Sequence, residues 1–223
     1  YPNYGLLSKR NREEQIAGSR VEVAPFKKDP ADFVLWKPSS DNQPGWDSPW
    51  GYGRPGWHIE CSAMSIKYLG EEFDIHGGGL DLKFPHHENE IAQAKCATER
   101  NFASLWMHTG PLRIDDKKMS KSLKNFITVK DILKDFHPEV LRLFFLLTHY
   151  RSPISYSKEG LENAKRVLDK FYTLFSNIKI PSKFNEDKSF REEFISVFQD
   201  DFNSPKAISL LQAYAGKAES GRD

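Results

Sequence analysis

The sequence predicts an α/β fold whose second half becomes helical. Strand-like and helical segments alternate between residues 57 and 118, as is typical of an α/β core. After residue 125, apolar residues recur at helical spacing instead. The chain has 223 residues, 39% of them hydrophobic. At roughly 150 residues per domain, this length allows one large domain or two modest ones.

The composition excludes several classes of protein. With 13% aromatic and 28% charged residues, the chain resembles soluble globular proteins rather than collagen-like, low-complexity or disordered ones. No apolar run approaches the ~20 residues that span a bilayer, so no membrane partner is expected. The 32 Lys and Arg against 31 Asp and Glu leave a net charge of +1, which neither requires nor excludes a nucleic-acid partner. Two cysteines, Cys61 and Cys96, favour reduced thiols and a cytoplasmic location.

The predicted strands lie in the first half. Residues 1–56 are rich in Pro, Gly and charge, and we expect a connecting module with short strands at 20–23 and 33–36. A helix is predicted at 57–69, because apolar residues share one face and Gly70 can end it. The elements predicted next are a strand at 73–76 that leads into three glycines, a helix from Pro85, a strand at 105–108 and a hairpin or loop at 111–118.

Helix signals dominate the second half. Thr128 and Asp131 have the spacing of a capping box, before apolar residues with helical periodicity up to Phe136. Pro138 can open the next helix, and a further helix is predicted over 161–175. Asn203-Ser204-Pro205 combines a cap with a first-turn proline and predicts the start of a last helix.

A possible metal site joins two of the predicted helices. His86 and Glu90 are four residues apart, so a helix from Pro85 places both on one face. A thiolate from Cys61 would complete a Cys/His/carboxylate set that zinc accepts. Three ligands with an open position are typical of catalytic rather than structural zinc. The alternative is that Cys61 is a small buried apolar residue and that the residues from His86 to Glu90 are a solvated helix start.

Two further segments could bind a nucleotide. The glycines 77–79 follow a predicted strand and allow close approach to the backbone, and Asp81 could accept a hydrogen bond from a ribose hydroxyl. A simple tight turn is the alternative. Lys118 and Lys121 lie in a basic loop that could close over a polyphosphate and stabilise charge on a departing phosphate. The alternative for this loop is a solvated basic segment.

Four motifs in this order closely resemble the cysteinyl-tRNA synthetase family of class I aminoacyl-tRNA synthetases. They are GWHIECSAM at 56–64, DIHGGG at 74–79, FPHHENE at 84–90 and KMSKS at 118–122. The resemblance implies the C-terminal half of a Rossmann-type class I catalytic domain, followed by a helical stem-contact and anticodon-side region. It also implies ATP-dependent activation of L-cysteine to cysteinyl-adenylate and transfer to tRNA(Cys).

The resemblance assigns roles to individual residues. Cys61, His86 and Glu90 are similar to three of the family's four zinc ligands, with one Zn²⁺ per subunit that binds the substrate thiolate. Trp57 and His76 resemble residues that line the cysteine pocket. The residues that resemble the ATP site are Gly79 and Asp81 near the ribose, and Lys118 and Lys121 in the signature loop. Mg²⁺ is expected to accompany ATP. A hydrophobic pocket discriminates only weakly between cysteine and serine. A soft metal would distinguish them, because it binds a thiolate in preference to a hydroxyl.

The resemblance divides the chain into four regions. Residues 1–56 would be the end of the connecting insertion and the entry to the core, and 57–125 the second half of the catalytic domain. Residues 126–157 would contact the tRNA stem, and 158–223 would begin the helical anticodon-side domain, apart from 212–223, which fit the family poorly. A monomer is expected.

One departure from the family pattern concerns the N-terminal side. The family's remaining zinc ligand is a cysteine near its N-terminus, beside the HIGH signature, and no His-x-Gly-His occurs in this sequence, which starts at Tyr1. We therefore expect part of a longer protein, without the complete zinc site and most of the ATP site. Two alternatives stay open: a zinc-dependent cysteine ligase that acts on an amino-sugar acceptor, and a non-catalytic tRNA-binding fragment.

Overall fold

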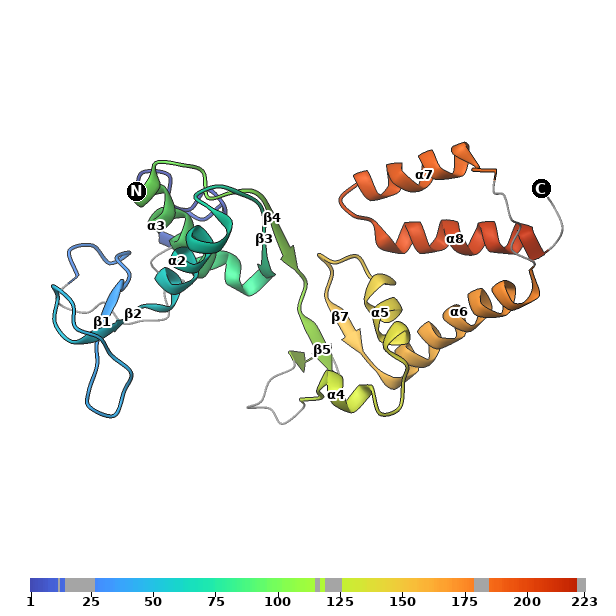
Figure 1. Cartoon of the computed structure of the whole chain (residues 1–223), viewed down its shortest axis with the longest axis horizontal. Coiled ribbons are helices and arrows are strands. Elements are labelled where there is room, and N and C mark those ends of the chain that lie inside the picture. Colours follow the sequence, from blue (N-terminus) through green and yellow to red (C-terminus); the bar gives the residue numbers. More distant parts are fainter. Residues whose placement is uncertain (12, 15–26, 115–116, 119–125, 179–184, 220–223) are drawn as a thin grey trace. The chain divides into compact units, whose positions relative to one another are not determined.

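The chain folds into two compact units. The computed structural model describes residues 1–11, 13–14, 27–114, 117–118, 126–178 and 185–219 (Figure 1). The two units are Tyr1–His108 and Thr109–Asp223. Among the described helices, none is long and apolar enough to cross a membrane. The four regions expected from the sequence, 1–56, 57–125, 126–157 and 158–223, do not coincide with these two units. They remain predictions.

The first unit begins with a small antiparallel strand pair. Strand β1 (Trp36–Pro38) pairs with β2 (Gly53–Pro55). The strand expected at 33–36 therefore begins only at its last residue, because pairing with β2 decides which residues are extended. The strand expected at 20–23 lies outside the described residues. Helix α2 (Trp57–Leu69) follows with the predicted bounds, and Gly70 ends it with a φ of +95°.

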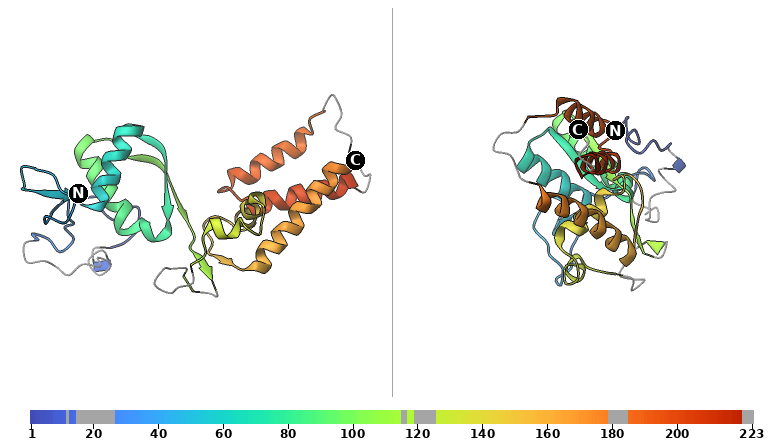
Figure 2. Two further views of the ribbon diagram at one scale, coloured as in Figure 1. Left: turned by 60° about the horizontal axis from the view of Figure 1, so that its bottom comes forward. Right: turned by 90° about the vertical axis from the view of Figure 1, so that its right-hand side faces the viewer.

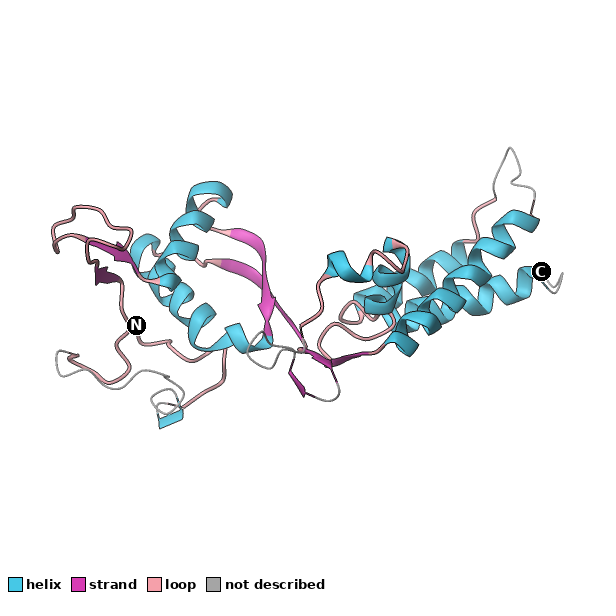
Figure 3. Cartoon of the chain, turned by 90° about the horizontal axis from the view of Figure 1, so that it is seen from below, coloured by secondary structure: helices cyan, strands magenta, loops and turns pink. Residues whose placement is uncertain are grey.

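A strand–helix–strand segment completes the first unit. Strand β3 (Phe73–Gly79) is hydrogen-bonded to β4 (Ala103–Thr109), and α3 (Glu88–Thr98) connects them. The triple glycine is the end of β3, so its interpretation as a tight turn is wrong. A short 3-10 helix, η1 (Leu80–Leu82), and a short π-helix, η2 (Lys83–His87), precede α3. Helices α2 and α3 pack on each other beside the β3–β4 pair (Figure 3).

The second unit contains a three-stranded sheet. Strand β5 (Leu112–Ile114) pairs antiparallel with β6 (Lys117–Lys118) and parallel with β7 (Ile154–Tyr156). The hairpin expected at 111–118 is thus present as β5 and β6. Helix α4 (Val129–Ile132) starts at the predicted cap, where the Asp131 N–H donates to Thr128 Oγ1 at 3.0 Å. Helix α5 (Pro138–Leu146) opens with the predicted proline.

Three longer helices complete the second unit. They are α6 (Lys158–Asn177), α7 (Lys188–Gln199) and α8 (Ser204–Glu219), and α8 lies beside α6 (Figure 2). The predicted cap of α8 is confirmed, because the Lys206 N–H donates to Asn203 Oδ1 at 3.2 Å. The core lies between α5 and α6, where Leu161 and Ala164 are fully buried against Val140, Leu141, Leu143 and Phe144.

Candidate metal centre

The three predicted zinc ligands converge. Cys61 comes from the first turns of α2, His86 from the turn before α3, and Glu90 from the first turn of α3. One ligand atom from each lies within 4.8 Å of the other two. The predicted spacing of His86 and Glu90 is confirmed, since His86 Nε2 lies 2.8 Å from Glu90 Oε1. Cys96 is exposed and outside this group.

Glu90 is the centre of the group and is fully buried. Its Oε2 lies 2.9 Å from His76 Nε2, opposite the contact of Oε1 with His86. Burial alone would raise the pKa of Glu90, but the two imidazoles outweigh it and hold the pKa at about 2. Neither approach has the geometry of a hydrogen bond, so both carboxylate oxygens lack a donor. A buried carboxylate without donors fits a bound cation.

Cys61 faces the same carboxylate. Burial, followed by the negative charge of Glu90, raises the pKa of the Cys61 thiol, so that without a cation the thiol keeps its proton. A cation placed between the sulfur and the carboxylate would reverse both effects, because it favours the thiolate. The Cys/His/Glu donor set and the donor-free oxygens of Glu90 therefore fit zinc.

Aromatic rings close one side of the group. The ring of Trp57 lies 4.4 Å from that of His86 between centroids, and the Trp57 side chain stays 58% exposed. His58 was not singled out by sequence reasoning, yet its Nδ1 lies 2.6 Å from His86 Nδ1. Burial, and then His86, lowers the pKa of His58 to about 4, which keeps this imidazole neutral at pH 7. It can then fix the orientation of the His86 ring.

A second set of donors shares Glu90. His76, His87 and Glu90 also bring one ligand atom each within 4.8 Å. His76 lies beside His87 and Trp106, with ring centroids 4.8 and 4.7 Å apart. His87 Nδ1 is in turn 2.9 Å from His108 Nε2. The sequence does not predict this second set, because it joins β3, η2 and α3 only in three dimensions.

The run from His86 to Glu90 is buried throughout, so its interpretation as a solvated helix start is wrong. Glu88 accepts hydrogen bonds from the backbone N–H groups of Gly5 at 2.8 Å and Ser8 at 2.8 Å. Asn89 accepts one from the Tyr4 hydroxyl at 2.5 Å. These two side chains anchor the N-terminal loop, and sequence reasoning missed them because their partners are some 80 residues away in the chain.

The predicted nucleotide residues are only partly described. Gly79 and Asp81 are adjacent, since a Cβ on Gly79 would lie 2.6 Å from Asp81 Oδ1. A Cβ on Gly78 would lie 2.8 Å from the ring of His87, so a tertiary contact requires that glycine. Lys118 ends β6, and only its backbone is described. Lys121 lies outside the described residues.

Comparisons with known proteins agree on one family. The family model described as tRNA synthetases class I (C) catalytic domain matches residues 1–166. The cysteine–tRNA ligase of Hydrogenovibrio crunogenus is 56% identical over 209 residues, which are 94% of this chain and 46% of that protein. The cysteine–tRNA ligase of Paramagnetospirillum magneticum is 56% identical over 214 residues, 96% of this chain and 47% of that protein. The chain thus spans about half the length of these relatives.

A solved structure shows the same fold at low identity. The LeuRS of Agrobacterium radiobacter, in a ternary complex with tRNA and LeuAMS, matches 79% of this chain and 29% of its own with a TM-score of 0.58 and 16% identity. This likeness concerns the fold alone. The mixed α/β first part and the helical last part of this chain agree with that fold. The match of the family model over residues 1–166 shows that the chain belongs to the class I cysteinyl-tRNA synthetase catalytic domain family.

Proposed function

We propose that the chain provides the cysteine-selecting and pyrophosphate-releasing parts of a cysteine–tRNA ligase. The complete reaction joins L-cysteine to ATP as cysteinyl-adenylate and then transfers cysteine to tRNA(Cys). The observation that carries the proposal is the convergence of Cys61, His86 and Glu90 within 4.8 Å. The identity of more than half of the residues to two cysteine–tRNA ligases supports it, and favours a tRNA over an amino-sugar acceptor.

Cysteine would be selected in the first unit. Cys61, His86 and Glu90 would hold one zinc, and when bound zinc favours a thiolate over a neutral hydroxyl, which separates cysteine from serine. Trp57 covers the His86 ring with its exposed indole and would shield the substrate side chain from water. His76 would orient Glu90 through the 2.9 Å contact and line the rest of the pocket.

The residues that the family pattern assigns to ATP are Gly79, Asp81, Lys118 and Lys121. Because Gly79 has no Cβ, the Asp81 side chain can lie beside the end of β3. There its carboxylate would accept hydrogen bonds from the ribose hydroxyls of ATP. Lys118 and Lys121 would place positive charge near the phosphates, and Mg²⁺ would accompany the nucleotide. Charge that develops on the leaving pyrophosphate is stabilised by such ammonium groups without any covalent step.

The other parts of the proposal follow the family pattern. Residues 57–125 would be the second half of a Rossmann-type domain, 126–157 the stem-contact region and 158–223 the start of the anticodon-side helices. The enzyme would be a monomer and would work in the cytoplasm.

A hybrid enzyme tests the proposal. The chain replaces the matching 46% of the Hydrogenovibrio crunogenus ligase, which supplies the remainder. We expect cysteine-dependent exchange of pyrophosphate into ATP, and charging of tRNA(Cys). In the hybrid, Cys61→Ser should lower kcat/KM for cysteine by at least tenfold, whereas Cys96→Ser, at the exposed cysteine, should leave it unchanged. A folded, zinc-loaded hybrid without exchange activity would contradict the proposal.

A further inference from the structure

Asp201 connects two segments of the second unit that are 50 residues apart. It lies in the turn between α7 and α8. Arg151 Nε donates to Asp201 Oδ2 at 2.5 Å and Arg151 Nη2 donates to Oδ1 at 2.9 Å, so the guanidinium is bound in a bidentate manner. The Tyr150 hydroxyl donates to Oδ1 at 2.7 Å, and His149 Nε2 lies 3.0 Å from the Asp201 carbonyl oxygen.

The backbone of this turn is unusual. Asp201 and Phe202 both have a φ of +54°, in the left-handed region that non-glycine residues rarely adopt. The Phe202 ring packs edge-on against Tyr150 at 6.4 Å between centroids. Such a conformation persists where surrounding contacts over-determine it, and here those contacts come from residues 149–151.

Residues 149–151 pack in turn on the start of the sheet. The Gly110 N–H donates to the Tyr150 carbonyl oxygen at 2.7 Å, and a Cβ on Gly110 would lie 2.1 Å from the Ser152 carbonyl oxygen. The Ile154 N–H donates to the Pro111 carbonyl oxygen at 3.0 Å, at the point where β7 joins β5. Because β5 pairs with β6, this chain of contacts ends at the strand that carries Lys118 (Figure 1).

The helices themselves have other support. Helix α8 packs on α5 and α6, Val197 and Ala207 are buried, and the rings of Phe190 and Tyr214 stack at 4.2 Å. The Asp201 side chain is 43% exposed, and exposed ion pairs contribute little to global stability. Hydrogen bonds from Arg151 hold the pKa of Asp201 at about 2, so its carboxylate is ionised at neutral pH. These features indicate that Asp201 positions neighbouring segments and contributes little to the stability of the fold.

We infer that Asp201 is a positioning residue that fixes the α7–α8 turn to residues 149–151 and, through Gly110, sets the position of the β5–β6 hairpin. The inference rests on the proposed function, in which the loop after Lys118 contacts ATP. Asp201 touches no substrate and acts through Arg151 and Tyr150. Its loss should free the hairpin while the α5–α6 core stays folded.

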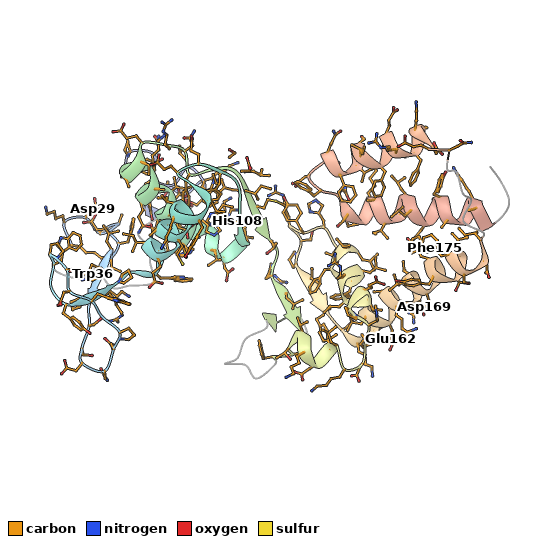
Figure 4. All side chains as sticks on the ribbon, viewed as in Figure 1. Asp29, Trp36, His108, Glu162, Asp169 and Phe175 are labelled. Carbon is orange, nitrogen blue, oxygen red and sulfur yellow. The ribbon has the colours of Figure 1, made fainter. Side chains whose placement is uncertain are left out.

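Amide hydrogen exchange on the chain itself tests the coupling. Asp201→Asn keeps the shape and tolerates the left-handed backbone, but loses the charge and one acceptor oxygen. We expect the Gly110 and Ile154 amides to exchange on the order of fivefold faster, the factor for a lost bidentate surface pair, and the Leu161 amide to keep its rate. The control is Asp169→Asn, because Asp169 binds Lys165 at 2.6 Å within α6 (Figure 4).

The control should leave all these rates unchanged. An unchanged Gly110 rate in Asp201→Asn would overturn the inference, and so would an equal acceleration of all amides, which would mean general destabilisation.

The hybrid enzyme gives the functional result. Asp201→Asn should lower kcat for pyrophosphate exchange and leave KM for cysteine unchanged, because cysteine would bind in the first unit. Its effect should not add to that of Arg151→Lys, since both remove the same bidentate contact. An inactive wild-type hybrid would count against the proposed function alone, since the exchange rates need no activity. An active hybrid in which Asp201→Asn keeps the wild-type kcat would overturn the inference.

Discussion

Glu88 and Glu90 are two positions apart on α3 and have different partners. The Glu90 carboxylate lies beside Cys61 and His86, whereas the Glu88 carboxylate accepts hydrogen bonds from the backbone N–H groups of Gly5 and Ser8. The i and i+4 spacing of His86 and Glu90 was readable in the sequence, because it follows from helix geometry alone. The partners of Glu88 were not, because no local pattern connects a carboxylate to backbone N–H groups some 80 residues away.

Glu88→Gln should destabilise the first unit. The substituted amide nitrogen cannot accept a hydrogen bond, so the N–H of Gly5, which is buried, or that of Ser8, which is partly buried, loses its partner. The expected loss in the free energy of unfolding is about 1–3 kcal/mol, measured by urea denaturation. Glu71→Gln, at an exposed position, is the matched control and should change it by less than about 0.5 kcal/mol. Equal stability of both variants would show that the Glu88 contacts do not hold the loop.

Lys121→Ala should affect the reaction and leave the fold intact. In the hybrid enzyme, loss of its ammonium group should lower the rate of pyrophosphate exchange, because charge on the leaving pyrophosphate would be less stabilised. Thermal unfolding should stay at the wild-type temperature. A large fall in the unfolding temperature, with a loss of pyrophosphate exchange no greater than the loss of folded protein, would make Lys121 a structural residue.

At the scale of elements, local signals predicted helix ends better than strand ends. Gly70 and Thr128 end and begin helices where the sequence indicates, because caps depend on neighbouring residues. The strand predicted at 33–36 begins three residues too early, because the extent of β1 is decided by its pairing with residues 53–55. The glycines of 77–79 were open to interpretation as a turn, because the packing of His87 on Gly78 has no signal in the sequence.

Leu161→Ala tests the packing of α5 against α6. Leu161 is fully buried among the apolar residues of α5, so truncation leaves a cavity. The free energy of unfolding of the second unit should fall by about 2–5 kcal/mol, measured by chemical denaturation. Zinc affinity should stay the same, because the proposed metal ligands lie in the other unit. A loss below about 1 kcal/mol would show that this interface is not a tightly packed core.

At the scale of the whole molecule, the chain has two compact units, and the residues of the proposed reaction are divided between them. The first unit gathers Cys61, His86 and Glu90, and the second carries Lys118 and helices α4 to α8. The family is recognisable from four motifs in the sequence, and the match of the family model to residues 1–166 confirms it.

The measurement that tests the central claim most directly is zinc affinity of the purified chain, determined by competition with a chelating dye. Cys61→Ser should weaken zinc binding by at least about tenfold, while Cys96→Ser should bind zinc as the wild type does. Added cysteine should strengthen binding to the wild type, because its thiolate would occupy the open position. Equal zinc affinity of the wild type and Cys61→Ser would contradict the assignment of this metal centre.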